Sequence, residues 1–188
     1  MGWTAIALSD DLAPGDVAGT RLDGQEVALW RDMAGVAHAW EDRCPHRGMR
    51  LSFGFVRSGH LTCLYHGWQY DAQGRCRAIP AHPELTPTST IRPTRHGCVE
   101  ASGMVWHGAG EPPPDMPAWP LRSLYCDVAV AALGSLRREE WRGTTLLLAP
   151  QPRNASQSCL HVVALTPPND VAALLHDLAA LRRSLEAA

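Results

Sequence analysis

The chain has 188 residues, enough for one medium-sized domain or two small ones. Hydrophobic residues make up 45 % and charged residues 19 %, a balance typical of a globular protein with a substantial core. Seventeen basic residues, all arginine, against nineteen acidic ones leave a net charge of −2, which indicates neither a nucleic-acid-binding surface nor a basic membrane patch. No apolar run approaches the roughly 20 residues of a membrane span, and the N-terminus lacks the basic region of a signal peptide. We therefore expect a cytoplasmic protein whose six cysteines are thiols or metal ligands rather than disulfides.

The first hundred residues predict short strands separated by turns. Apolar runs alternate with Asp-Gly and other glycine-containing segments, a pattern typical of β-hairpins. The expected strands are 4–8, 17–22, 26–31 and 36–41, followed by a turn-and-strand unit at 70–80 and two strands within 89–108. We therefore expect an all-β domain over residues 1–110, built from small antiparallel sheets.

Residues 111–120 contain five prolines and mark an expected linker, because so many prolines prevent a helix or a central strand. Beyond it, 123–133, 144–150 and 159–166 resemble strands, and the tail predicts a helix with Asn169 or Asp170 as its N-cap. One face of this helix is apolar, which favours packing on a sheet; its members are Val171, Leu174, Leu175, Leu178, Leu181 and Leu185. The expected second domain, residues 121–188, is a small α+β domain.

Two short segments each offer a cysteine and a histidine: Cys44-x-His46 and, after sixteen intervening residues, Cys63-x-x-His66. Two thiolates and two imidazoles suit either zinc or an iron–sulfur centre. A structural zinc finger usually takes its two cysteines from one end and its two histidines from the other. Here each loop supplies one of each, which favours a two-iron centre held between the two loops.

The run "CPHRG…CLYHGWQYDAQGRCRAIP" resembles the Rieske [2Fe–2S] domain, in the version found in Rieske non-haem iron oxygenases of the aromatic-ring-hydroxylating and demethylating type. The likeness covers roughly residues 4–108. It implies two cluster-binding loops, with Cys44 and Cys63 on one iron and His46 and His66 on the other. Leu64 stands where the family usually has proline. No further cysteine lies within either loop, so the loop-bracing disulfide of respiratory Rieske proteins is not expected.

In the remainder of the chain, the second iron site of such oxygenases, which consists of two histidines and a carboxylate, is not recognisable. After residue 108 the only histidines are His161 and His176, and no Asp-x-x-His pattern precedes either one. We therefore expect both to be structural or surface residues, and the C-terminal domain to resemble a shortened catalytic domain. Cys76, Cys98, Cys126 and Cys159 show no metal-like spacing and are expected to be buried thiols.

These observations predict a one-electron carrier that works with a reductase, an oxygenase subunit or both. The Rieske likeness implies one [2Fe–2S] cluster per chain, with Cys44, His46, Cys63 and His66 as its ligands. A second hypothesis is a non-catalytic assembly subunit of a hetero-oligomeric Rieske oxygenase; either role is compatible with a homo- or hetero-oligomer. A third is an oxygenase with unusual iron ligands, for example His161 and His176 with Asp170 or Asp177. A fourth is a zinc-stabilised binding module.

Overall fold

The computed structural model describes residues 2–187 and divides into two compact units. The N-terminal unit comprises 12–20 and 26–98, and the C-terminal unit comprises 2–11, 21–25 and 99–187. These two units do not meet at the linker expected over residues 111–120. The strands before residue 12 and after residue 98 both belong to the C-terminal unit. Where one functional domain ends and the next begins stays a prediction. No helix among the described residues is both long and apolar enough to cross a membrane.

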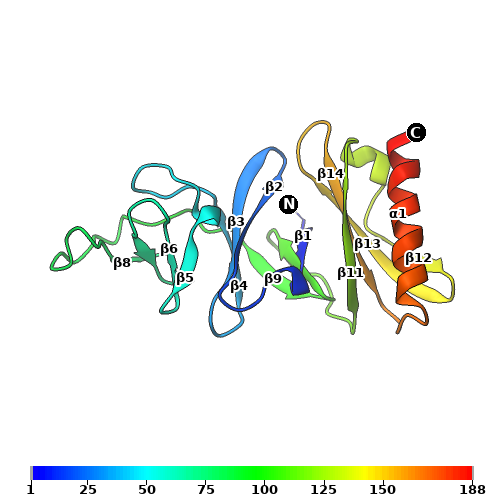
Figure 1. Cartoon of the computed structure of the whole chain (residues 1–188), viewed down its shortest axis with the longest axis horizontal. Coiled ribbons are helices and arrows are strands. Elements are labelled where there is room, and N and C mark those ends of the chain that lie inside the picture. Colours follow the sequence, from blue (N-terminus) through cyan, green and yellow to red (C-terminus); the bar gives the residue numbers. More distant parts are fainter. Residues whose placement is uncertain (1, 188) are drawn as a thin grey trace. The chain divides into compact units, whose positions relative to one another are not determined.

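The N-terminal unit contains two small antiparallel sheets, apart from residues 21–25 at the β2–β3 turn, which belong to the C-terminal unit (Figure 1). The first has the order β2-β3-β4 and the second β5-β6-β7-β8. Their bounds are β2 Val17–Leu22, β3 Gln25–Arg31, β4 Ala37–Glu41, β5 Phe55–Arg57, β6 His60–Thr62, β7 Gln69–Tyr70 and β8 Cys76–Ala78, with a 3-10 turn η2 at Leu51–Phe53. Asp23 and Gly24, at the turn between β2 and β3, both have positive φ, as the Asp-Gly signal predicts.

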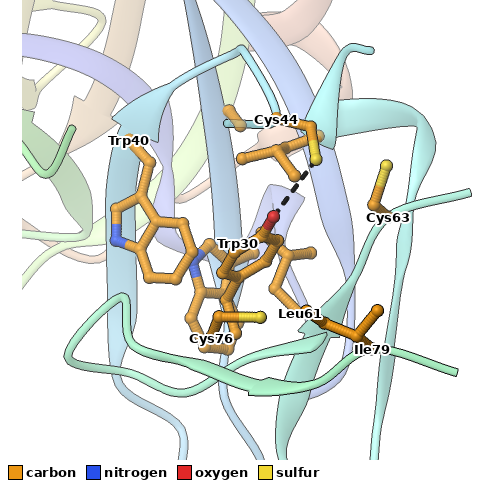
Figure 2. Close-up of a cluster of buried hydrophobic side chains, with 10 residues drawn as sticks. Trp30, Trp40, Cys44, Leu61, Cys63, Cys76 and Ile79 are labelled. Atoms are coloured by element: carbon orange, nitrogen blue, oxygen red, sulfur yellow. Dashed lines mark hydrogen bonds between the residues drawn. The ribbon is translucent and has the colours of Figure 1, made fainter. Parts of the chain in front are cut away.

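A buried core fills the N-terminal unit between its sheets (Figure 2). Its largest side chains are Trp30, Trp40 and Tyr70, each at most 1 % exposed. The thiols of Cys44 and Cys63 belong to the same core. The two loops that carry the predicted ligands are therefore anchored on tightly packed strands.

The C-terminal unit consists of two antiparallel sheets and one helix. One sheet has the order β1-β10-β9 and the other β11-β14-β13-β12. Their bounds are β1 Thr4–Leu8, β9 Cys98–Ala101, β10 Met104–His107, β11 Trp119–Cys126, β12 Arg137–Trp141, β13 Thr144–Pro152 and β14 Ser158–Ala164, with 3-10 turns η1 at Ser9–Asp11 and η3 at Val130–Leu133. Helix α1 (Val171–Ala187) lies along one face of the four-stranded sheet and buries Leu174 and Leu178 against it (Figure 1).

Most expected elements are present, and the all-β architecture with a C-terminal helix is confirmed. Asp170 caps the helix, because its Oδ1 accepts the Ala173 N–H at 2.9 Å. The expected strand over 123–133 instead begins at Trp119, inside the proline-rich segment, and ends at Cys126. Proline is tolerated there because β11 is an edge strand and its register shifts between Pro120 and Arg122.

The proline-rich segment is held in place by the β9–β10 turn. The Ser102 N–H donates to the Asp115 carboxylate at 2.7 Å, and the Ser102 hydroxyl donates to the Pro114 carbonyl at 2.9 Å. The Met116 N–H in turn donates to the Ser102 hydroxyl at 3.0 Å. Ser102 is 1 % exposed, so the segment is packed against the C-terminal unit along these residues.

Candidate cluster-binding site

The first loop leaves β4 and closes on itself around Cys44. The Cys44 N–H donates to the Met49 carbonyl at 2.7 Å, and the Gly48 N–H donates to the Cys44 carbonyl at 2.8 Å. Gly48 has φ +73°, a conformation that costs glycine little and other residues much more. The turn therefore fixes Cys44 and His46 within one short, hydrogen-bonded loop.

A buried carboxylate braces the far end of the first loop. Asp42 is 5 % exposed, and its two oxygens accept the backbone N–H of Ser52 at 2.7 Å and the Ser52 hydroxyl at 2.6 Å. A Cβ at Gly19 would come within 3.1 Å of the Ser52 oxygen, so the neighbouring strand leaves little room for this pair to move. Sequence reasoning missed Asp42, although its place two residues before Cys44 is visible in the sequence.

The second loop leaves β6 and repeats the hydrogen-bond pattern of the first. The Cys63 N–H donates to the Trp68 carbonyl at 2.9 Å, and the Gly67 N–H donates to the Cys63 carbonyl at 3.0 Å. Gly67 has φ +68°, and a Cβ there would come within 3.0 Å of Pro80. Both loops thus use the glycine that follows the histidine to turn the chain back toward its strand.

The two loops bring the predicted ligands together as two pairs. Cys44 and Cys63, each 2 % exposed, place their sulfurs at the same end of the buried core (Figure 2). The rings of His46 and His66 have centroids 4.8 Å apart. His46 is half-buried and His66 is exposed. The sulfurs therefore lie on the protein side of the site and the imidazoles on the solvent side.

Aromatic rings hold both histidines. Trp68 stacks on His46 with 4.2 Å between ring centroids and 7° between planes. Tyr65 lies over His66 at 3.8 Å, while its own side chain is 57 % exposed. Trp68 thus supports the ring of a predicted ligand.

A buried tyrosine reaches a cysteine sulfur. The hydroxyl of Tyr70 lies 3.2 Å from Cys44 Sγ. Burial, together with Cys44, raises the pKa of Tyr70, so the phenol stays protonated and donates when Cys44 is a thiolate. The side chain of Tyr70 points from β7 into the core, whereas Tyr65 lies at an exposed loop position. The sequence alone does not show which of the two tyrosines is buried.

The protein environment acts differently on the thiols and on the imidazoles of the site. Burial raises the pKa of Cys63, as does Cys44, while the backbone N–H groups of Tyr65 and His66 favour its thiolate. Burial, with the nearby His66 and Arg47, lowers the pKa of His46, so its ring is neutral and able to bind a metal ion. A metal ion removes the thiol protons outright.

The donor set fits a two-iron cluster. Within residues 2–187 no three His, Cys, Asp or Glu side chains lie close enough to hold a single metal ion. A Rieske cluster asks for only two protein ligands at each iron, two cysteines at one and two histidines at the other. The pairing of thiol with thiol and imidazole with imidazole supplies that set.

The unusual oxygenase ligands considered above are occupied by structural contacts. His161 is 1 % exposed, its Nδ1 lies 2.9 Å from the Ser123 hydroxyl, and its Nε2 lies 2.9 Å from Gln151 Oε1. Asp170 caps α1, and Asp177 accepts hydrogen bonds from Trp141 and Arg142. Within residues 2–187 no three such side chains lie close enough to hold one ion, so the structure gives this hypothesis no support.

The four remaining cysteines form no disulfide within the described residues. Cys76, Cys126 and Cys159 are buried, whereas Cys98 is only half-buried. Cys76 belongs to the same core as Cys44 and Cys63 (Figure 2).

Comparison with known proteins agrees with this site. Residues 2–91 match the family model of the Rieske [2Fe–2S] domain. The oxidoreductase NdmD of Pseudomonas putida is 42 % identical over 112 residues, covering 59 % of this chain and 19 % of that protein. The oxygenase subunit of 3-chlorobenzoate-3,4-dioxygenase of Comamonas testosteroni is 35 % identical over 106 residues, covering 55 % of this chain and 24 % of that subunit. The chain thus matches about a fifth to a quarter of the length of these relatives.

The fold extends the likeness beyond the matched segment. The solved structure of NdmA from Pseudomonas putida CBB5 superimposes with a TM-score of 0.76 and 17 % identity, covering 99 % of this chain and 81 % of that one. At this identity the likeness is one of fold. The family match supports Rieske-type electron transfer by this part of the chain. Residues 2–91 of this chain belong to the Rieske [2Fe–2S] domain family, whose cofactor is a [2Fe–2S] cluster.

Proposed function

We propose that this protein transfers single electrons within an oxygenase system and that Cys44, His46, Cys63 and His66 hold its cluster. The observation that carries the proposal is the convergence of two Cys-and-His loops, with the thiols buried and the imidazoles 4.8 Å apart. When bound, the cluster supplies reversible one-electron transfer at about −150 to +300 mV.

The surrounding residues suit this task. Tyr70 and the backbone N–H groups of the second loop point donors at the sulfurs, which stabilises negative charge there. The buried sulfur side keeps water away, while the exposed His66 brings the site to the surface. A one-electron partner therefore approaches at the histidines, where the path through protein is shortest.

The ligand assignment is tested with single substitutions. Cys63→Ser and His66→Ala are each expected to lose the iron and sulfide of the cluster and its EPR signal. Cys76→Ser is the matched control, because Cys76 is a buried thiol of the same core without a predicted ligand role. Full cluster content in Cys63→Ser or in His66→Ala would refute the assignment.

The working partners are a reductase that supplies the electron and an oxygenase that accepts it. Support comes from the relatives, which include an oxidoreductase and an oxygenase subunit. The test is reduction of the purified protein by a reductase and its reoxidation by an oxygenase chain encoded beside it. A cluster that neither accepts nor returns an electron in such a mixture would contradict the proposal.

A second candidate is a non-catalytic subunit of an oligomeric oxygenase. The observation in its favour is that the fold likeness reaches into the C-terminal unit, since it covers 99 % of this chain for NdmA and 87 % for dicamba monooxygenase. In that case the protein is expected to co-purify in a fixed ratio with a chain that carries the second iron site. A monomer that exchanges electrons with a separate oxygenase would favour the electron carrier instead.

A further inference from the structure

A distant segment of the N-terminal unit lies beside the first ligand loop. The Glu41 N–H donates to the Thr94 carbonyl at 2.9 Å, and the His96 N–H donates to the Ala39 carbonyl at 2.9 Å. The Thr94 hydroxyl also donates to the Glu41 carboxylate at 2.8 Å. These bonds add residues 92–96 to the edge of β4, immediately before the loop that carries His46.

The loop and this segment enclose a hollow of about 350 Å³. Its lining includes His46 and three arginines, Arg43 and Arg47 from the loop and Arg92 from the added segment. We name it the arginine hollow after these three residues. All three side chains are exposed, so the hollow opens to solvent beside a predicted cluster ligand.

The positive charge of the arginine hollow is largely uncompensated. Glu41 is the single acidic residue in its lining, and that carboxylate accepts the Thr94 hydroxyl. No carboxylate within residues 2–187 forms an ion pair with Arg43, Arg47 or Arg92. A local excess of positive charge on a chain of net charge −2 attracts a negatively charged surface at this place in particular.

Exposed apolar side chains stand beside the histidines. Leu64 is 56 % exposed and Tyr65 57 %, and Tyr65 covers the ring of His66. An apolar centre with a charged rim is the usual composition of a protein–protein interface, whereas a site for a small anion needs no such apolar patch. The arrangement therefore fits a protein partner rather than a free ion.

We propose that the arginine hollow docks an electron-transfer protein with an acidic face around its own redox centre. This inference rests on the proposed electron-carrier function and names the chemistry of the electron donor. The partner loses one electron, the cluster gains it, and no covalent bond changes. Arg43, Arg47 and Arg92 steer the acidic face toward His46, which places the two redox centres close together.

The test uses a plant-type [2Fe–2S] ferredoxin with an acidic surface as the probe. The potential of such a ferredoxin lies below the Rieske range, so its electron flows toward this protein. Binding to the cluster-loaded protein is measured by surface plasmon resonance, and electron transfer by stopped-flow, at ionic strengths from about 0.02 to 0.5 M. Replacing Arg43, Arg47 and Arg92 together by glutamine is expected to slow association about tenfold or more at low ionic strength and to flatten its salt dependence.

Two further variants serve as controls. Changing Arg122, Arg182 and Arg183 to glutamine removes the same total charge from exposed positions of the C-terminal unit and is expected to leave binding close to wild type. Changing the three arginines of the hollow to lysine is expected to restore most of the association rate. Equal binding by the wild type and the glutamine variant of the hollow, or a preference for a basic cytochrome c, would overturn the docking proposal. If the docking proposal holds but the proposed electron-transfer function fails, binding still depends on the arginines and the cluster is not reduced.

Discussion

The hydroxyl of Tyr70 offers a test of the site at the level of one atom. Tyr70→Phe removes the oxygen that lies 3.2 Å from Cys44 Sγ and leaves the fully buried ring in place. A ligating thiolate can only accept a hydrogen bond, so Tyr70 is the donor. Because reduction adds negative charge near the sulfurs, the bond is stronger in the reduced state and raises the reduction potential.

The size of the effect follows from the strength of the bond. A hydrogen bond to a charged group contributes about 1.5–3 kcal/mol. If reduction strengthens it by about 1 kcal/mol, the one-electron conversion of about 59 mV per tenfold change gives a potential about 40 mV lower in Tyr70→Phe. An EPR-monitored redox titration measures this shift.

Tyr65→Phe is the control for this measurement. The Tyr65 side chain is exposed, and its hydroxyl bonds no cysteine sulfur among the described residues, so its loss is expected to leave the potential unchanged. An unchanged or higher potential in Tyr70→Phe at full cluster content would refute the assigned role of the hydroxyl.

Three further predictions concern stability. Ser52→Ala leaves buried Asp42 with one hydrogen bond fewer and is expected to cost about 1–3 kcal/mol in chemical denaturation, with partial loss of bound iron. Burial lowers the pKa of His161 to about 3, so between that value and about 6.5 the unfolded chain binds one proton more than the native one. The free energy of unfolding therefore falls as the pH falls, by about 2 kcal/mol at pH 5, because His161 stays neutral in the native state. His161→Gln is expected to remove this part of the pH dependence. Asp170→Ala removes the N-cap of α1 and is expected to lower the free energy of unfolding by about 1 kcal/mol.

Each of these predictions has a control and a contrary outcome. Ser135→Ala, at an exposed position, is expected to leave the free energy of unfolding unchanged. A loss of stability as large as in Ser52→Ala would contradict the role assigned to Ser52. An unchanged slope of stability against pH in His161→Gln would show that His161 is not the group responsible. Asp170→Asn retains a capping side chain and is expected to stay close to wild type, so a loss as large as in Asp170→Ala would contradict the capping role.

The ligand motif was predictable because it is local. Cys44 with His46, and Cys63 with His66, each lie within one loop, so their spacing identifies the donor set before any fold is known. The partners of the ligands were not predictable in the same way. Tyr70 reaches Cys44 from β7 across the core, and the short apolar runs around it do not show which tyrosine faces inward.

In the C-terminal unit, too, some elements and contacts could not be predicted from the local sequence. Strand β12 (Arg137–Trp141) has a charged sequence without an apolar alternation, and pairing with β13 makes it a strand. The network of His161 also depends on pairing, because its partners Ser123 and Gln151 come from the two strands that flank β14. Likewise β1 pairs with β10, about one hundred residues later, which no local signal indicates.

The central claim is that this chain holds a Rieske [2Fe–2S] cluster. The most direct measurement is the EPR spectrum of the reduced protein after anaerobic purification, with iron, sulfide and zinc analysis of the same sample. The expected result is a Rieske signal with two irons and two sulfides per chain. Zinc in place of iron, or a cluster-loaded protein without that signal, would contradict the claim.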